Sequence, residues 1–383
     1  MKVTITKADL CGEINAIPSK SCAHRALICS ALSENSAQIL NLPDSKDIEA
    51  TINCLKSLIA DSQEADCGES GSTLRFLMPL VPALKKNITF IMHGRLPERP
   101  LFPLDCELQN HGCISEKNGN RLHVSGNLTG GIYKLPGNVS SQYITGLLLA
   151  LPLLNQDSEI HIDGVLESEP YINMTTDIQK KFGVETEFKN NIFYVKGNQK
   201  YVAPESFTVE GDWSNGAFWL SAEKLTRGKI KCHGLDASSS QGDKEIVNIL
   251  QNLPCTVDAR NIPDLVPIIS AVASVTKGTT TIVNAKRLEL KESNRLEAID
   301  TVLKALGADI TKTDDGLIIN GKEMLNGGTV DSFNDHRIAM MAAIAAIKCS
   351  DAVIVTNAEA VKKSYPAFWH DYKALGGKIK EEL

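Results

Sequence analysis

Residues 334–347 read Asn-Asp-His-Arg-Ile-Ala-Met-Met-Ala-Ala-Ile-Ala-Ala-Ile, and a short polar turn separates them from the run Ala352–Thr356. Every residue from Ile338 to Ile347 is apolar, so a helix formed here has no polar face and must lie inside a core. The run that follows is typical of a strand. This unit, a buried helix followed by a strand, is the basis of the architecture because the chain repeats it.

The same unit occurs six times along the chain. Its apolar helices are expected at Ala23–Leu32, Thr73–Leu84, Gln142–Leu154, Ala217–Leu225, Leu265–Val275 and Ile338–Ile347. Its strands are expected at Ala37–Leu42, Ile88–His93, Glu159–Asp163, Lys229–His233, Thr279–Asn284 and Ala352–Thr356. A second, more amphipathic helix follows in each repeat, and several of these end near a glycine, the usual residue just past a helix C-terminus. We therefore predict an α/β fold in which strands cover buried helices, divided into two domains of three repeats.

Length and composition limit the class of protein. A chain of 383 residues exceeds what one hydrophobic core organises, so two domains are expected. The net charge of −6 argues against a nucleic-acid partner, which would need a basic face. The ten cysteines show no metal-ligand spacing, the N-terminus has no apolar signal core, and no apolar run is long enough for a bilayer. We therefore expect a soluble, cytoplasmic protein with no cofactor, metal or membrane span.

Polar residues gather at one place in each repeat, just before or at the start of the apolar helix. They are Ser19-Lys20-Ser21, Ser70-Gly71-Ser72, Ser140-Ser141-Gln142, Ser214-Asn215, Asp264 and Asn334-Asp335-His336-Arg337. Helix N-termini present free N–H groups and the positive end of a dipole, which suit anions. An alternative is that these residues only cap their helices. Capping does not require the accompanying cations Lys20, Arg25, Arg75 and Arg337, so these favour a cleft for anionic ligands.

Read in order, these segments resemble the EPSP synthase family over nearly the whole chain. The resemblance rests on Ile17–Arg25, Gly68–Arg75, Glu98–Pro100, Ser140–Gln142, Ser168–Tyr171, Gly211-Asp212, Gln241–Asp243, Ile262–Asp264, Lys291–Arg295, Asn334–Arg337 and Lys363–Pro366. It implies a two-domain inside-out α/β barrel, each domain holding three βαβαββ units around buried helices. It also implies one discontinuous domain, residues 1–18 plus 212–383, into which a second domain, residues 19–211, is inserted.

The resemblance implies an enzyme that transfers the enolpyruvyl group of phosphoenolpyruvate to the 5-hydroxyl of shikimate 3-phosphate and releases phosphate. This is a step of the shikimate pathway to chorismate and the aromatic amino acids, and it proceeds by addition and elimination through a tetrahedral intermediate. Each substrate carries a phosphate and a carboxylate, so fixed cations are needed to bring the two together. We expect a monomer, and the resemblance implies that glyphosate competes with phosphoenolpyruvate.

The resemblance also assigns residues to the substrates and to the chemistry. Shikimate 3-phosphate would bind Lys20, Ser21, Arg25, Ser140, Ser141, Ser168, Tyr171, Asp264 and Lys291. Phosphoenolpyruvate would bind Lys20, Gly71, Arg99, Gln142, Arg295, Arg337 and Lys363. The catalytic residues would be Asp264 as the base for the 5-hydroxyl, Glu292 as the acid for the methylene carbon, and Lys20. Asp335 and His336 would support the phosphate end, with a purely structural role for His336 as the alternative.

Four positions depart from the family's pattern, namely Glu69, Phe76, Arg287 and Asn294. Glu69 adds a negative charge near the expected phosphoenolpyruvate site.

Two other functions are alternatives to this transfer. A sister transferase that acts on UDP-N-acetylglucosamine is disfavoured because the segment Ile91–Asp105 lacks the loop cysteine of that family. An inactive scaffold that binds anions or partners is disfavoured by the intact residues Lys20, Asp264, Glu292, Arg337 and Lys363.

Overall fold

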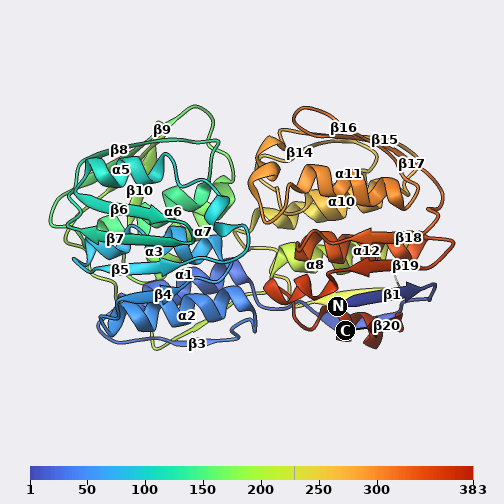
Figure 1. Cartoon of the computed structure of the whole chain (residues 1–383), viewed down its shortest axis with the longest axis horizontal. Helices are drawn as coiled ribbons and strands as arrows, with labels where there is room; N and C mark the ends of the chain where they lie inside the picture. The colour runs from blue at the N-terminus through green and yellow to red at the C-terminus, as the bar shows by residue number, and fades with distance from the viewer. Residues whose placement is uncertain (228, 383) are drawn as a thin grey trace. The chain divides into compact units, whose positions relative to one another are not determined.

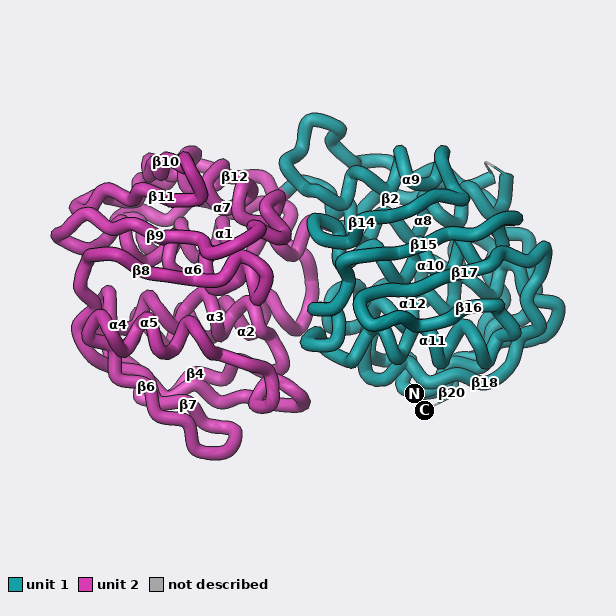
Figure 2. The backbone as a smooth tube through the Cα atoms, turned by 90° about the horizontal axis from the view of Figure 1, so that it is seen from above, with its two compact units in different colours: residues 1–17, 210–383 teal, residues 18–209 magenta. Residues whose placement is uncertain are grey.

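The computed structural model describes residues 1–227 and 229–382, and the chain divides into two compact units. Unit 1 comprises Met1–Ile17 and Glu210–Leu383, and unit 2 comprises Pro18–Val209, drawn in teal and magenta in Figure 2. Unit 2 is therefore inserted into unit 1. The predicted discontinuous domain, residues 1–18 plus 212–383, differs from unit 1 at both crossings. Its first part ends one residue later than that of unit 1, and its second part begins two residues later.

Unit 2 contains three sheets and seven α-helices. Its strands are β3 (Gln38–Leu40), β4 (Glu64–Asp66), β5 (Ile88–Ile91), β6 (Cys113–Asn118), β7 (Arg121–Gly126), β8 (Ile132–Pro136), β9 (Ser158–Asp163), β10 (Thr186–Lys189), β11 (Ile192–Val195) and β12 (Ser206–Thr208). Its α-helices are α1 (Lys20–Ala31), α2 (Lys46–Ile59), α3 (Gly71–Leu77), α4 (Leu80–Ala83), α5 (Leu104–Asn110), α6 (Ser141–Ala150) and α7 (Glu169–Lys181). The sheet orders are β4-β5-β7-β6, β10-β11-β9-β8 and β12-β3.

Unit 1 repeats this organisation. Its strands are β1 (Lys2–Thr6), β2 (Gly12–Asn15), β13 (Ile230–His233), β14 (Thr256–Asp258), β15 (Gly278–Val283), β16 (Asp309–Lys312), β17 (Leu317–Gly321), β18 (Gly328–Asp331), β19 (Val353–Thr356) and β20 (Lys378–Glu382). Its α-helices are α8 (Trp213–Leu225), α9 (Ile246–Asn252), α10 (Val266–Ala273), α11 (Arg295–Ala305), α12 (His336–Ala345) and α13 (Phe368–Ala374). Two of its 3-10 helices, η4 (Lys286–Leu290) and η6 (Ala358–Lys363), lead to or carry residues of the candidate site.

The strand pairing follows one pattern in all four larger sheets. In each, one parallel pair is extended by two antiparallel strands, as in β14-β15-β17-β16 and β18-β19-β1-β20. The last sheet places the N-terminal strand β1 beside the C-terminal strand β20 (Figure 1). Each of these four sheets has the strands of one βαβαββ unit, as the family resemblance implies, whereas the two remaining sheets in the described residues, β12-β3 and β13-β2, have two strands each.

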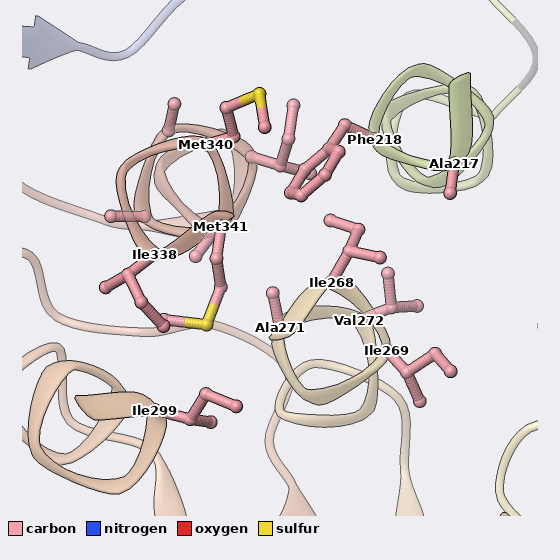
Figure 3. Packing of buried hydrophobic residues seen from close by; sticks show 14 of the residues in the cluster. Ala217, Phe218, Ile268, Ile269, Ala271, Val272, Ile299, Ile338, Met340 and Met341 are labelled. Carbon is pink, nitrogen blue, oxygen red and sulfur yellow. The ribbon is translucent and has the colours of Figure 1, made fainter. Parts of the chain in front are cut away.

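The first helix of each repeat lies inside its unit. Every residue of α10 and of α12 is buried. Figure 3 shows Phe218 of α8, Ile268 of α10 and Met340 of α12 gathered in one core, with Ile299 of the second helix α11 at its edge. The absence of a polar face in the sequence is thus explained by packing on all sides. Among the described residues, no helix has the length and apolarity that a membrane crossing requires.

One predicted helix is broken in the structure. The range Thr73–Leu84 forms two short helices, α3 and α4, because Pro79 has no N–H to donate to the carbonyl of Arg75. Helix α6 packs against that carbonyl at Gly146, where an added Cβ would lie 2.3 Å from the Arg75 oxygen. Only glycine permits this approach. The predicted helix Gln142–Leu154 likewise ends at Ala150 and continues as the 3-10 turn Leu151–Leu153, which contains Pro152.

The loops that lead into the buried helices have nearly uniform lengths. In five repeats the helix begins five residues after the preceding strand ends, as from Asp331 of β18 to His336 of α12. The exception is α10, which begins at Val266, eight residues after β14 ends at Asp258. The three additional residues belong to the loop that carries Asp264.

Candidate active site

The starts of the buried helices differ in how they are capped. Side chains of five residues accept hydrogen bonds from first-turn N–H groups, and these are Ser19, Ser70, Ser140, Asp212 and Asp335. Helix α10 has no side-chain cap, although Asp264 lies just before it. Capping therefore explains Ser19, Ser70, Ser140 and Asp335 of the sequence pattern, but it explains neither Asp264 nor the cations that stand beside the caps.

Three carboxylates converge on one buried guanidinium in unit 1. Arg295, at the start of α11, is 1% exposed. Its Nε donates to Asp335 Oδ2 at 2.8 Å, its Nη1 to Asp264 Oδ1 at 2.8 Å, and its Nη2 to Glu292 Oε2 at 2.6 Å. Burial lowers the pKa of Arg295, but the three carboxylates, Asp335 foremost, outweigh this and raise the pKa above its usual value. Arg295 is thus a permanent cation that fixes the positions of three acids.

Asp264 is also held by a second arginine. Arg337 Nη2 donates to Asp264 Oδ2 at 2.9 Å and to Ser214 Oγ at 2.9 Å. These bonds join the starts of α8, α10 and α12, so three helix N-termini meet at one place in unit 1. Burial raises the pKa of Asp264, but its cationic neighbours, Arg337 foremost, hold the pKa of this carboxyl well below its usual value. Asp264 is therefore ionised at neutral pH and can accept a proton.

Two lysines border this cluster. Lys291 Nζ lies 3.8 Å from Asp264 Oδ1, and burial lowers the pKa of Lys291 to about 8. Lys363, at the end of η6, donates from Nζ to the backbone carbonyl of Asn334 at 2.7 Å. Asn334 directly precedes Asp335, whose buried carboxylate caps α12 and binds Arg295. His336 is buried beside it, with Nδ1 3.8 Å from Asp335 Oδ1.

In unit 2, a glycine loop brings two guanidinium groups together. Gly71 opens α3, and an added Cβ there would lie 2.5 Å from Arg75 Nη1 and 2.6 Å from Arg99 Nη1. Gln142, in the first turn of α6, accepts from Arg75 Nη1 at 3.0 Å and donates to Ser72 Oγ at 3.0 Å. The predicted residues Gly71, Arg99 and Gln142 therefore surround one cationic spot beside a helix N-terminus, the kind of place where anions bind.

Lys20, the first residue of α1, is paired with an acid that the sequence interpretation did not include. Its Nζ lies 2.7 Å from Asp47 Oδ2, and both side chains are largely buried. Asp47 is in the first turn of α2, where an acidic residue is an ordinary partner of the helix dipole. Because this explanation is sufficient, the sequence alone gives no sign that Asp47 has a functional role.

Arg25 is a buried cation surrounded by neutral acceptors. Its Nε donates to Thr175 Oγ1 at 2.7 Å, its Nη1 to the Ser21 carbonyl at 2.7 Å, and its Nη2 to the Tyr171 carbonyl at 2.8 Å. Burial lowers the pKa of Arg25 to about 10, which leaves it charged at neutral pH. The sequence predicts that Ser21 and Arg25 share one helix face, and the Arg25 side chain turns back over Ser21 to reach its backbone carbonyl.

The serines predicted to bind a phosphate lie at two neighbouring helix starts. Ser140 caps α6, and Ser141 is its first residue. Ser168 precedes α7 with a left-handed backbone (φ 56°), and its carbonyl, not its side chain, accepts from the first turn of that helix, at 3.0 Å from the Tyr171 nitrogen. The Glu167 N–H donates to the Gly137 carbonyl at 3.0 Å, which joins the loops before the two helices.

Comparison with known proteins identifies the family. The sequence model of the EPSP synthase (3-phosphoshikimate 1-carboxyvinyltransferase) family matches residues 5–66, 59–261 and 254–372. The chain belongs to the EPSP synthase family. The 3-phosphoshikimate 1-carboxyvinyltransferase of Clostridium acetobutylicum is 44% identical over an alignment of 422 positions, which covers 99% of this chain and 98% of that protein. The same enzyme of Clostridium perfringens strain SM101 is 43% identical and covers all of both chains.

A solved structure supports the family's fold. The EPSP synthase from Acinetobacter baumannii superposes with a TM-score of 0.82 at 20% identity, covering 99% of this chain. The predicted two-domain α/β fold is thus confirmed. Membership of the EPSP synthase family likewise confirms the predicted activity, which is the transfer of the enolpyruvyl group of phosphoenolpyruvate to shikimate 3-phosphate. The rival transferase and scaffold interpretations are set aside.

The positions named by the EPSP synthase resemblance form distinct groups in the structure. In unit 1, one cluster contains Asp264, Lys291, Glu292, Arg295, Asp335, His336 and Arg337, and Lys363 is linked to it through Asn334. In unit 2, Gly71, Arg99 and Gln142 form one group, Ser21, Arg25 and Tyr171 a second, Ser140, Ser141 and Ser168 a third, and Lys20 pairs with Asp47.

Proposed function

We propose that the cluster around Arg295 is the catalytic centre of the transfer, with Asp264 as the base and Glu292 as the acid. One observation carries this assignment: a single buried guanidinium is bonded to both carboxylates, at 2.8 Å and 2.6 Å. Two carboxylates fixed on one cation are held within reach of neighbouring atoms of a small substrate, which general acid–base catalysis requires.

The proposed reaction has two stages. In the first, Asp264 accepts the proton of the 5-hydroxyl as that oxygen bonds to C2 of phosphoenolpyruvate, and Glu292 gives a proton to C3, which becomes a methyl group. In the second, the C2–O bond to phosphate breaks, the leaving phosphate takes the proton held by Asp264, and Glu292 recovers a proton from the methyl group. Glu292 Oε2 accepts from Arg295, so the transferable proton belongs on its other oxygen.

The groups in unit 2 support the proposed shikimate 3-phosphate site. The acceptors that Arg25 contacts in the described part of the chain are neutral, so it can balance a carboxylate or phosphate. Ser140, Ser141 and Ser168 offer hydroxyl groups at two helix starts for a phosphate that must bind without reacting. Lys20, Ser21, Tyr171 and, in unit 1, Lys291 and Asp264 complete the proposed set.

The proposed phosphoenolpyruvate residues are the cations and the glycine loop. In unit 2 they are Lys20, Gly71, Arg99 and Gln142, and in unit 1 they are Arg295, Arg337 and Lys363. Arginine forks suit carboxylate and phosphate groups, and lysine acts as a point charge. Lys20 is proposed as a catalytic cation whose charge is directed by Asp47. Asp335 supports Arg295 and Arg337, and His336 is proposed as their buried neighbour.

Phosphate release with both substrates tests the proposed roles. Asp264→Asn and Glu292→Gln should each lower kcat by about 10²–10⁴-fold, the usual cost of removing a positioned acid or base. Asp309→Asn is the matched control, since Asp309 is an exposed acid of unit 1 on β16. Near-normal kcat in either cluster variant would refute its assignment. Gel filtration and cell fractionation test the proposed monomer and its proposed cytoplasmic location.

A further inference from the structure

Asp331, the last residue of β18, joins two loops of unit 1. The first loop, residues 332–335, connects β18 to α12 and leads to the Asp335–Arg337 segment. The second begins at Asn357, after β19, and leads through η6 to Lys363. Because β18 and β19 are parallel and Asp331 pairs in register with Thr356, both loops leave the sheet at the same edge.

The carboxylate of Asp331 accepts hydrogen bonds from both loops. From the first loop, the Phe333 N–H donates to Oδ1 at 2.6 Å. From the second, Asn357 Nδ2 lies 3.1 Å from Oδ1 and 3.0 Å from Oδ2. Thr356 Oγ1 adds a bond to Oδ2 at 3.0 Å. One charged side chain thus accepts three donors and links two segments that are distant in the sequence.

The first loop has a conformation that requires such support. Phe333 and Asn334 both have φ 53°, and the Asp335 N–H donates to the Ser332 carbonyl at 2.9 Å, which defines a type I′ turn. This turn favours glycine and asparagine, so a phenylalanine at its first central position is strained. The turn directs the Asn334 carbonyl at Lys363 Nζ, 2.7 Å away.

We propose that Asp331 is a positioning residue for the transfer, which holds the two loops so that Lys363 stays beside the Asp335–Arg337 segment. The inference rests on the proposed roles of Lys363 and Arg337 in binding phosphoenolpyruvate. Asp331 acts through the strained turn and does not itself need to touch either substrate. Its removal lets the turn relax, and the Asn334 carbonyl then no longer fixes the ammonium group of Lys363.

Steady-state kinetics with each substrate varied in turn test this role. In Asp331→Ala, the KM for phosphoenolpyruvate should rise about tenfold, as expected for the loss of one hydrogen bond to a charged group, while that for shikimate 3-phosphate changes less than about twofold. Asp331→Asn keeps an acceptor for the Phe333 N–H but presents an amide to Asn357, so its effect should be smaller. Asp351→Asn is the control, because Asp351 is an exposed acid just before the opposite end of β19.

A double-mutant cycle shows whether Asp331 acts through the second loop. Asn357→Ala keeps the bonds of Asp331 to Phe333 and Thr356, and it remains informative even if Asp331→Ala fails to fold. It should raise the KM for phosphoenolpyruvate, and when combined with Asp331→Asn it should add little. Full additivity, or equal increases in both KM values together with a lower melting temperature, would overturn the inference.

The variant Lys363→Met distinguishes a failure of this inference from a failure of the proposed function on which it rests. If this variant leaves the KM for phosphoenolpyruvate unchanged, the proposed role of Lys363 fails. If it raises that KM while the Asp331 and Asn357 variants behave as the Asp351 control, the role of Lys363 stands and the positioning role of Asp331 is refuted.

Discussion

Replacing Lys291 by methionine should stabilise unit 1 at neutral pH. Burial lowers the pKa of this lysine from its usual 10.5 to about 8 despite the attraction of Asp264, so the fold disfavours the charged form by about 3 kcal/mol. At pH 7 the lysine is protonated in both the folded and unfolded states, and the full cost is present. Above pH 8 the folded state loses the proton first, so the cost falls to about 1.5 kcal/mol by pH 9.5.

Urea unfolding, monitored by tryptophan fluorescence, measures this change in the stability of unit 1. All three tryptophans of the chain, Trp213, Trp219 and Trp369, lie in unit 1. Lys291→Met should exceed the wild-type free energy of unfolding by about 3 kcal/mol at pH 7 and by about half as much at pH 9.5. The control Lys286→Met removes an exposed lysine of the neighbouring η4 helix and should change stability by less than about 0.5 kcal/mol. If the two variants are equally stable at pH 7, or if the advantage of Lys291→Met grows with pH, the reasoning fails.

Three further outcomes are expected. The double variant Ser140→Ala with Ser141→Ala should raise the KM for shikimate 3-phosphate at least about tenfold, because each hydrogen bond to a charged group contributes about 1.5–3 kcal/mol. An equal rise in the KM for phosphoenolpyruvate would contradict the proposed sites. Gly71→Ala places a methyl group 2.5 Å from Arg75 Nη1 and 2.6 Å from Arg99 Nη1, so both guanidinium groups must shift. Glyphosate inhibition should then weaken more than the KM for phosphoenolpyruvate rises, and identical responses of wild type and variant would remove this loop from the site. EDTA should leave phosphate release unchanged, and strong inhibition would contradict the metal-free expectation.

The repeat could be predicted because its signal is local. A helix that is apolar on every side, such as Ile338–Ile347, can only be buried, and a strand-like run after each such helix predicts the sheets around it. The break between α3 and α4 was not predicted, although Pro79 is visible in the sequence. The missing N–H of Pro79 is enough to predict the break. Only the tertiary structure shows that Gly146 of α6, far along the chain, packs against the freed carbonyl of Arg75.

The family, the order of the repeats and the residues at the helix starts can be read from the sequence, because consecutive residues carry these properties. The partners of those residues become known only from the folded chain. Asp264, Glu292 and Asp335 come from three separate segments, and one guanidinium, that of Arg295, binds all three. Asp47 was missed as the partner of Lys20 because an acid in a first helical turn has an ordinary explanation. Charge pairing acts over a few ångströms in space, and distances between segments arise only when the buried helices pack together.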